Sequence, residues 1–142
     1  MDKVKLDTGM ISGFTENQNG REISIFRGIP YAAPPVGNLR WQPPRPAVPW
    51  PGVRKCTEFS IQAAQFPDIH AWEKWQAMPS SEDCLYLNVM TPAKKAGEKL
   101  PVMVFFYGGG FTSVAGSMPA YNGTTLAEKG VIVVTPSYRL GA

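Results

Sequence analysis

The stretch that decides the fold is LPVMVFFYGGGF, residues 100–111. Its first part, residues 100–106, is a continuous apolar run rich in valine and phenylalanine. A run that is apolar at every position predicts a strand buried on both faces, as in the middle of an α/β sheet. Three consecutive glycines, residues 108–110, follow directly at the carboxyl end of this strand.

The glycine run has a chemical use at that position. Without Cβ atoms, backbone N–H groups can converge on one cavity, and a ligand can approach them closely. The oxyanion of a tetrahedral intermediate needs such donors, and one donor contributes about 2.7–4 kcal/mol of transition-state stabilisation. The alternative is a flexible glycine loop without chemical meaning. Because Tyr107 and Phe111 flank the glycines directly after an apolar strand, we favour the oxyanion site.

Further elements are predicted on either side of this stretch. Leu85 to Met90 alternates between two faces, and Val131 to Thr135 is a second, strongly β-branched apolar run. Thr124 to Lys129 fits one or two helical turns, closed by Gly130. This order suits the start of a mixed or mainly parallel α/β sheet. Since the sequence supplies almost no helix to cover such a sheet, we expect that the chain cannot complete it alone.

The N-terminal part predicts a small antiparallel sheet. It contains three short apolar or alternating stretches, at residues 4–6, 10–13 and 23–27. Residues 17–20, Asn-Gln-Asn-Gly, form a hairpin turn signal between the last two stretches, because asparagine and glycine tolerate positive φ.

Residues 30–51 hold eight of the 14 prolines of the chain. Proline at this density excludes helix and central strand. The PPRP motif has the form of a proline-rich ligand for a recognition module. We favour instead an ordered, extended segment that Trp41 and Trp50 pin to the core, because a free ligand seldom carries two tryptophans.

Composition excludes several classes of protein. Hydrophobic residues make up 44% and charged residues 18% of the 142 residues, so the chain is long and apolar enough for a real core. The net charge is +3, but the basic residues are scattered along the sequence, and we therefore expect no nucleic-acid role. No apolar run approaches the roughly 20 residues of a membrane span. The N-terminus shows no signal peptide, which predicts a cytoplasmic protein or a secreted form whose leader was removed.

Two cysteines, Cys56 and Cys84, are too few for a disulfide framework, and their spacing is not that of a zinc site. The spacing leaves two alternatives open: one bridge, or two buried free thiols in a reducing compartment. No metal ligands or organic cofactor motif are recognised.

Four blocks of sequence together resemble the type-B carboxylesterase and cholinesterase family. They occur in the same order as in that family, from about residue 9 to residue 142. The four blocks are FRGIPYA with PPVG and LRW (26–41), SEDCLYLNV (81–89), LPVMV with YGGGF (100–111), and the 131–135 run with YRLG (138–141). Four collinear blocks are far more specific than any one of them.

The resemblance implies an α/β-hydrolase fold, of which residues 1–142 are the N-terminal segment of a single domain, and a serine esterase mechanism. It implies that Gly109 and Gly110 donate two of the oxyanion-hole N–H groups and that Gly108 allows the turn. Phe111 is expected to line the acyl side of the pocket. Tyr107 stands where many members of the family have histidine, and it is expected beside the substrate.

The resemblance also implies structural pairs. Cys56 and Cys84 match the family's first disulfide, and the loop between them, residues 57–83, would form part of the rim of the active-site entrance. Trp72 is expected on this rim. Arg40 and Glu82 are expected to form an ion pair that ties the proline-rich segment to the second signature.

The remaining catalytic machinery is missing from this sequence. None of the eight serines has glycine two residues before it, as the G-x-S-x-G elbow requires, and the single histidine, His70, precedes the glycine loop. We therefore expect the serine, acid and histidine further along a longer chain that hydrolyses carboxylic esters without a cofactor or metal, and no activity from residues 1–142 alone. The alternatives are a catalytically inactive cholinesterase-like binding or adhesion protein, or a non-catalytic truncated fragment.

Overall fold

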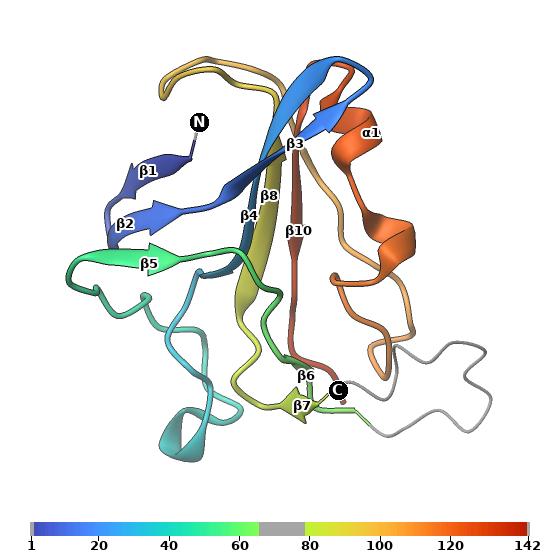
Figure 1. Cartoon of the computed structure of the whole chain (residues 1–142). Helices are drawn as coiled ribbons and strands as arrows, with labels where there is room; N and C mark the ends of the chain where they lie inside the picture. The colour runs from blue at the N-terminus through green and yellow to red at the C-terminus, as the bar shows by residue number, and fades with distance from the viewer. Residues whose placement is uncertain (1, 66–78, 142) are drawn as a thin grey trace.

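The computed structural model describes residues 2–65 and 79–141, and a five-stranded sheet forms its centre (Figure 1). The strands follow the spatial order β3-β4-β8-β10-β9. Their bounds are β3 Phe14–Gln18, β4 Arg21–Pro30, β8 Tyr86–Thr91, β10 Ile132–Pro136 and β9 Val102–Val104. The first three neighbouring pairs are antiparallel and β10 pairs β9 in parallel, so the sheet is mixed, as predicted.

A second, three-stranded sheet lies against one face of the first. It has the order β1-β2-β5 and is made by β1 Lys3–Leu6, β2 Gly9–Ser12 and β5 Val53–Lys55. The sequence predicted that residues 23–27 would complete this small sheet, and that expectation is wrong. Those residues belong to β4 of the large sheet, while β5 pairs with β2 in parallel. The predicted hairpin turn joins β3 to β4, with Asn19 and Gly20 at positive φ.

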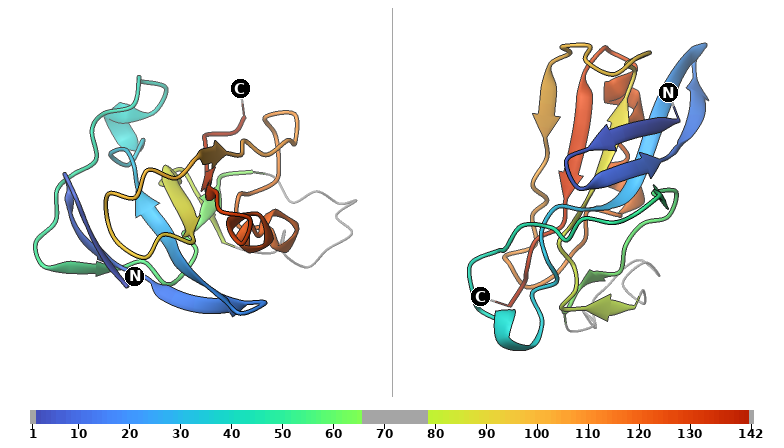
Figure 2. Two further views of the ribbon diagram at one scale, coloured as in Figure 1. Left: turned by 90° about the horizontal axis from the view of Figure 1, so that it is seen from above. Right: turned by 90° about the vertical axis from the view of Figure 1, so that its left-hand side faces the viewer.

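Two apolar clusters fill the two sides of the large sheet. On one side Ile23, Ile25, Met90 and Val133 pack against Ala127 of helix α1, Thr124–Ala127. The other cluster joins Ile11 of the small sheet to side chains of β4 and β8, which are Phe26, Ile29, Leu87 and Val89. The helix and the small sheet therefore cover opposite faces of the large sheet (Figures 1 and 2).

Strand β9 is the uncovered edge of the large sheet. In the part of the chain that the structure describes, it has a hydrogen-bonded neighbour only in β10 (Figure 2, right). Val102, Met103 and Val104 are 59%, 44% and 48% exposed. The prediction of a strand was correct, but its predicted burial on both faces is wrong for this chain. The apolar pattern needs covering elements, and the described residues supply none at this edge.

The proline-rich segment is irregular and is pinned at one tryptophan only. Trp50 donates its Nε1–H to the carbonyl of Met10 over 2.8 Å, and the Arg54 guanidinium lies over its ring. Trp41, in contrast, is 73% exposed. The segment contains one short 3₁₀ helix, η1 Gly37–Leu39. The prediction of an extended, anchored segment therefore holds for its C-terminal end and fails for Trp41.

The remaining elements are short. They are the two-residue strands β6 Gln62–Ala63 and β7 Ser80–Ser81, and a second 3₁₀ helix, η3 Pro119–Tyr121. Within residues 2–65 and 79–141, no helix has the length and apolar character needed to cross a bilayer.

Candidate functional site: the glycine loop

The glycine loop begins where β9 ends and is anchored by two stacked tyrosines. The ring of Tyr107, only 3% exposed, stacks on that of Tyr138 with centroids 4.4 Å apart and planes 17° apart. The Tyr138 hydroxyl donates a hydrogen bond to the Tyr107 carbonyl. Burial raises the pKa of Tyr107 to about 12, so its phenol stays neutral. This contact fixes the first residue of the loop.

Backbone conformation and close contacts both favour glycine at position 109 of this loop. Its φ is +125°, a value that residues with a side chain rarely adopt. A Cβ atom there would lie 3.0 Å from the Ser113 carbonyl carbon and closer still to its oxygen. Gly110 has φ +59°, but a Cβ atom there would meet only Thr112 Oγ1, at 4.0 Å, and Gly108 has neither positive φ nor a neighbour within 4 Å. The steric need for glycine is therefore concentrated at Gly109.

Hydrogen bonds hold the loop from inside and from its far end. The Gly109 carbonyl accepts from the N–H of Thr112 at 3.0 Å, the N–H of Ser113 at 3.2 Å and the Thr112 hydroxyl at 3.0 Å. The Phe111 carbonyl accepts from the Gly141 N–H at 2.7 Å. Among residues 2–65 and 79–141, no acceptor is bound to the N–H groups of Gly109 and Gly110.

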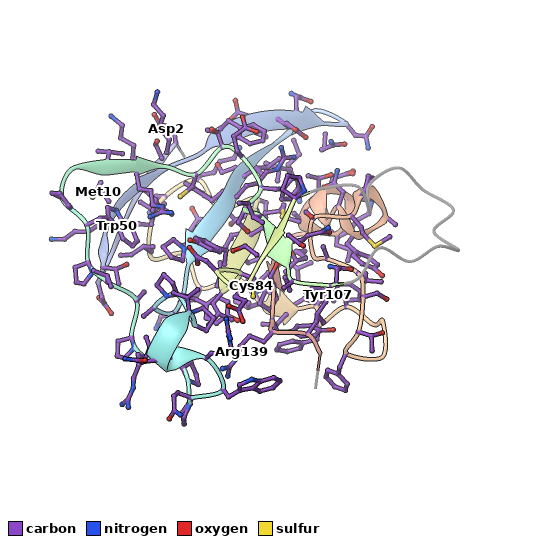
Figure 3. All side chains as sticks on the ribbon, turned by 90° about the horizontal axis from the view of Figure 1, so that it is seen from below. Asp2, Met10, Trp50, Cys84, Tyr107 and Arg139 are labelled. Atoms are coloured by element: carbon purple, nitrogen blue, oxygen red, sulfur yellow. The ribbon has the colours of Figure 1, made fainter. Side chains whose placement is uncertain are left out.

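A hollow of about 590 Å³ opens beside the loop. It is lined by Phe106, Tyr107, Gly108, Gly110, Phe111, Tyr138 and Arg139. The predicted site residues Tyr107, Gly108, Gly110 and Phe111 therefore come together around the hollow, whereas Gly109 is not among the residues that line it. Phe111 is 63% exposed, in keeping with a residue that can meet a substrate. Tyr107 and Arg139, which both line the hollow, are labelled in Figure 3.

Sequence reasoning missed Thr112, Tyr138 and Gly141 as supports of the loop. The signal that could have found two of them is the parallel pairing of β9 with β10. Segments that follow neighbouring parallel strands emerge at the same edge of a sheet. The YRLG motif follows β10 as the glycine motif follows β9. Tyr138 and Gly141 of this motif donate hydrogen bonds to the carbonyls at the two ends of the loop.

The predicted ion pair is present. Arg40 Nε lies 2.6 Å from one oxygen of the Glu82 carboxylate, and a second guanidinium nitrogen lies 2.7 Å from the other. This bidentate hydrogen bonding lowers the pKa of Glu82 and raises that of Arg40. The pair joins the proline-rich segment to the second signature, although both side chains remain partly exposed.

The predicted disulfide is absent, which corrects that assignment. Cys56 and Cys84 are both buried free thiols. They belong to different apolar clusters, since Cys56 packs with Ile11, Phe26 and Ile29, whereas Cys84 packs with Ala63. Burial raises the pKa of both thiols, that of Cys84 to about 11.

Two residues named in the sequence analysis lie outside the described residues: Trp72, expected on the rim, and His70, the single histidine. Over residues 2–65 and 79–141, no cluster of three or more histidine, cysteine, aspartate or glutamate side chains is placed to hold a metal ion.

Comparison with known proteins covers almost the whole chain. A family model described as "Carboxylesterase family" matches residues 1–142. Fumonisin B1 esterase from Sphingopyxis macrogoltabida is 44% identical over 99% of this chain and 25% of its own length. Cholinesterase from Mus musculus is 41% identical over 98% of this chain and 24% of its own, and carboxylesterase 1E from Rattus norvegicus 39% over 92% and 24%. The chain thus spans about a quarter of the length of these relatives.

Proposed function

The chain belongs to the carboxylesterase family, and on that premise we propose that it is the N-terminal part of a serine esterase and supplies its oxyanion hole. The family implies the α/β-hydrolase fold, and the three named relatives are two esterases and a cholinesterase. The observation that carries the proposal is the glycine loop at the end of β9, with two N–H groups unused by the described part of the protein.

In the proposed reaction, a serine oxygen from the rest of the protein forms a bond to the acyl carbon of a carboxylic ester while a histidine takes its proton. The carbonyl electron pair moves onto oxygen, and the N–H groups of Gly109 and Gly110 stabilise that negative charge. The pair then returns, the bond to the alcohol breaks, and the histidine gives the alcohol its proton. Water then attacks the acyl-serine in the same way, the bond to the serine oxygen breaks, and the acid is released. Neither a metal nor a cofactor takes part in these steps.

The surroundings of the loop support an apolar acyl group in the substrate. Phe106 and Phe111 are 68% and 63% exposed beside the hollow, where an acyl chain could cover them. Tyr107 contributes little contact surface because Tyr138 covers its ring. We therefore assign Tyr107 to the support of the loop and Phe111 to substrate contact.

The exposed edge of the sheet supports a requirement for more polypeptide. Val102 and Val104 are apolar and about half exposed on a strand with an open hydrogen-bonding edge. Relatives about four times as long contain sequence that could cover it. We propose that the remainder of the hydrolase chain packs on β9 and completes the domain, and that residues 1–142 alone do not turn over esters.

The test is the intact mass of the purified gene product before and after treatment with a fluorophosphonate, which reacts with activated serines. We expect a mass far above 15.5 kDa that rises by one phosphonyl group, together with hydrolysis of a p-nitrophenyl ester. A long protein without adduct or turnover would refute the esterase and favour an inactive binding protein. A product of 15.5 kDa without either would leave a non-catalytic fragment.

A further inference from the structure

We propose that Thr112 is a positioning residue of the oxyanion hole, in which its hydroxyl fixes the direction of the Gly110 N–H. This inference rests on the function proposed above, and it assigns a role to a side chain outside the glycine motif. Thr112 touches no reacting atom. It acts through the peptide group that joins Gly109 to Gly110.

The geometry begins at the Gly109 carbonyl. Its oxygen accepts the Thr112 hydroxyl at 3.0 Å, in addition to the backbone N–H groups of Thr112 and Ser113. Of these three donors, only the hydroxyl comes from a side chain, so only this contact depends directly on the choice of amino acid. Threonine is branched at Cβ and has few χ1 rotamers, which keeps the hydroxyl in place at low entropic cost.

Peptide planarity carries the effect to the donor. The carbonyl of Gly109 and the N–H of Gly110 belong to one planar trans unit and point in opposite directions. An anchor on the carbonyl therefore sets the direction of the N–H. Such an anchor matters here because Gly109 and Gly110 have no side chains to restrict their backbone. A donor bound to the carbonyl also polarises the peptide group, which makes its N–H a stronger donor.

The same relation holds one peptide further along the loop. The Gly141 N–H donates to the Phe111 carbonyl at 2.7 Å, and this carbonyl shares a peptide plane with the Thr112 N–H. That N–H in turn donates to Gly109. The segment after β10 thus holds the backbone of Thr112, and Thr112 holds the carbonyl behind the Gly110 donor.

The test compares Thr112→Val, which replaces the hydroxyl by a methyl group of similar size, with Thr112→Ser, which keeps the hydroxyl. Both are made in the full-length protein, with Thr125→Val as the control. Thr125 is also exposed and lies in α1, away from the loop. The measurements are kcat and KM for one p-nitrophenyl ester, the inhibition constant of a trifluoromethyl ketone, which forms an oxyanion adduct, and the thermal midpoint.

We expect kcat of Thr112→Val to fall about tenfold, because complete loss of an oxyanion donor costs about 10²–10³-fold and here the donor remains but is held less firmly. The ketone should bind more weakly by a similar factor, while KM and the thermal midpoint stay unchanged. Thr112→Ser should retain most of the wild-type kcat, and Thr125→Val all of it.

Wild-type kcat in Thr112→Val would overturn the inference, as would an equal loss in Thr112→Ser. A loss that appears only in KM or in the thermal midpoint would also overturn it, because it would mean a role in binding or folding. These outcomes are distinct from failure of the proposed function, in which the wild-type protein itself would neither hydrolyse the ester nor take up the fluorophosphonate.

Discussion

Replacement of Gly109 by alanine tests whether the loop conformation is the source of oxyanion stabilisation. The new methyl group would fall against the Ser113 carbonyl, with the carbonyl carbon 3.0 Å away and Val114 Cγ2 at 3.1 Å. The obstacle is backbone, which cannot rotate away as a flexible side chain would. The φ of +125° adds strain of about 1–3 kcal/mol for a residue with a side chain. The loop must therefore shift, and the N–H groups shift with it.

The magnitude follows from the number of donors that move. Loss of one oxyanion donor lowers kcat by about 10²–10³-fold. Since Gly109 and Gly110 are adjacent, a shift at Gly109 displaces both, and we expect kcat of Gly109→Ala to fall by at least about 10²-fold. The assay is steady-state hydrolysis of a p-nitrophenyl ester by the full-length protein, with the rate of fluorophosphonate labelling as a second measure.

A matched control separates backbone strain from loop displacement. Gly97 also has positive φ, +86°, but a Cβ atom there meets nothing within 4 Å, and it lies in the linker before β9. Gly97→Ala should therefore lose about 1–2 kcal/mol of stability, as expected for a left-handed residue with a side chain, while it keeps wild-type kcat. If Gly109→Ala retained kcat within about threefold of wild type, the reasoning from the Ser113 contact would be refuted.

Three further outcomes are expected. Glu82→Gln removes the carboxylate whose pKa the bidentate hydrogen bond lowers. The variant should therefore be less stable than the wild type above the ordinary pKa of 4.5, and this stability difference should vanish as the pH falls through the lowered pKa. Thermal melts of both proteins from pH 7 to pH 2.5 would contradict this if the difference in melting temperature stayed constant. Cys56 and Cys84 should react with a thiol reagent only after unfolding, whereas a native mass lower by one pair of hydrogens would mean a bridge. Tyr138→Phe, which deletes the hydroxyl that holds the first loop carbonyl, should lower the free energy of unfolding by about 1 kcal/mol, and an unchanged urea midpoint would argue against that bond.

Local pattern was enough to predict the central strands but not their surroundings. The alternation of 85–90 and the β-branched run of 131–135 correspond to β8 and β10. The apolar run at 100–106 predicted a strand correctly, yet the strand is exposed. Periodicity reports which faces of a strand are apolar. It does not report whether the covering elements belong to the same stretch of chain.

The disulfide shows a different limit of sequence reasoning. Cys84 lies within a recognised motif, and only the resemblance to the family implied that Cys56 is its disulfide partner. The fold instead places Cys56 beneath the small sheet and Ala63 beside Cys84. Motif spacing does not determine which of the two clusters each cysteine enters. The Arg40–Glu82 pair was predictable because both residues lie inside recognised motifs.

The exposed edge and the glycine loop are parts of one arrangement. The loop follows β9, and the two residues that bind its ends, Tyr138 and Gly141, follow β10. These segments meet because neighbouring parallel strands end at the same edge of a sheet. The free side of β9 is the place where a further parallel strand can add. Whatever followed such a strand would emerge beside Gly110, at the edge where the proposed oxyanion donors lie. On the proposed function, the open edge of β9 is therefore also the place from which a nucleophile could reach the proposed oxyanion donors.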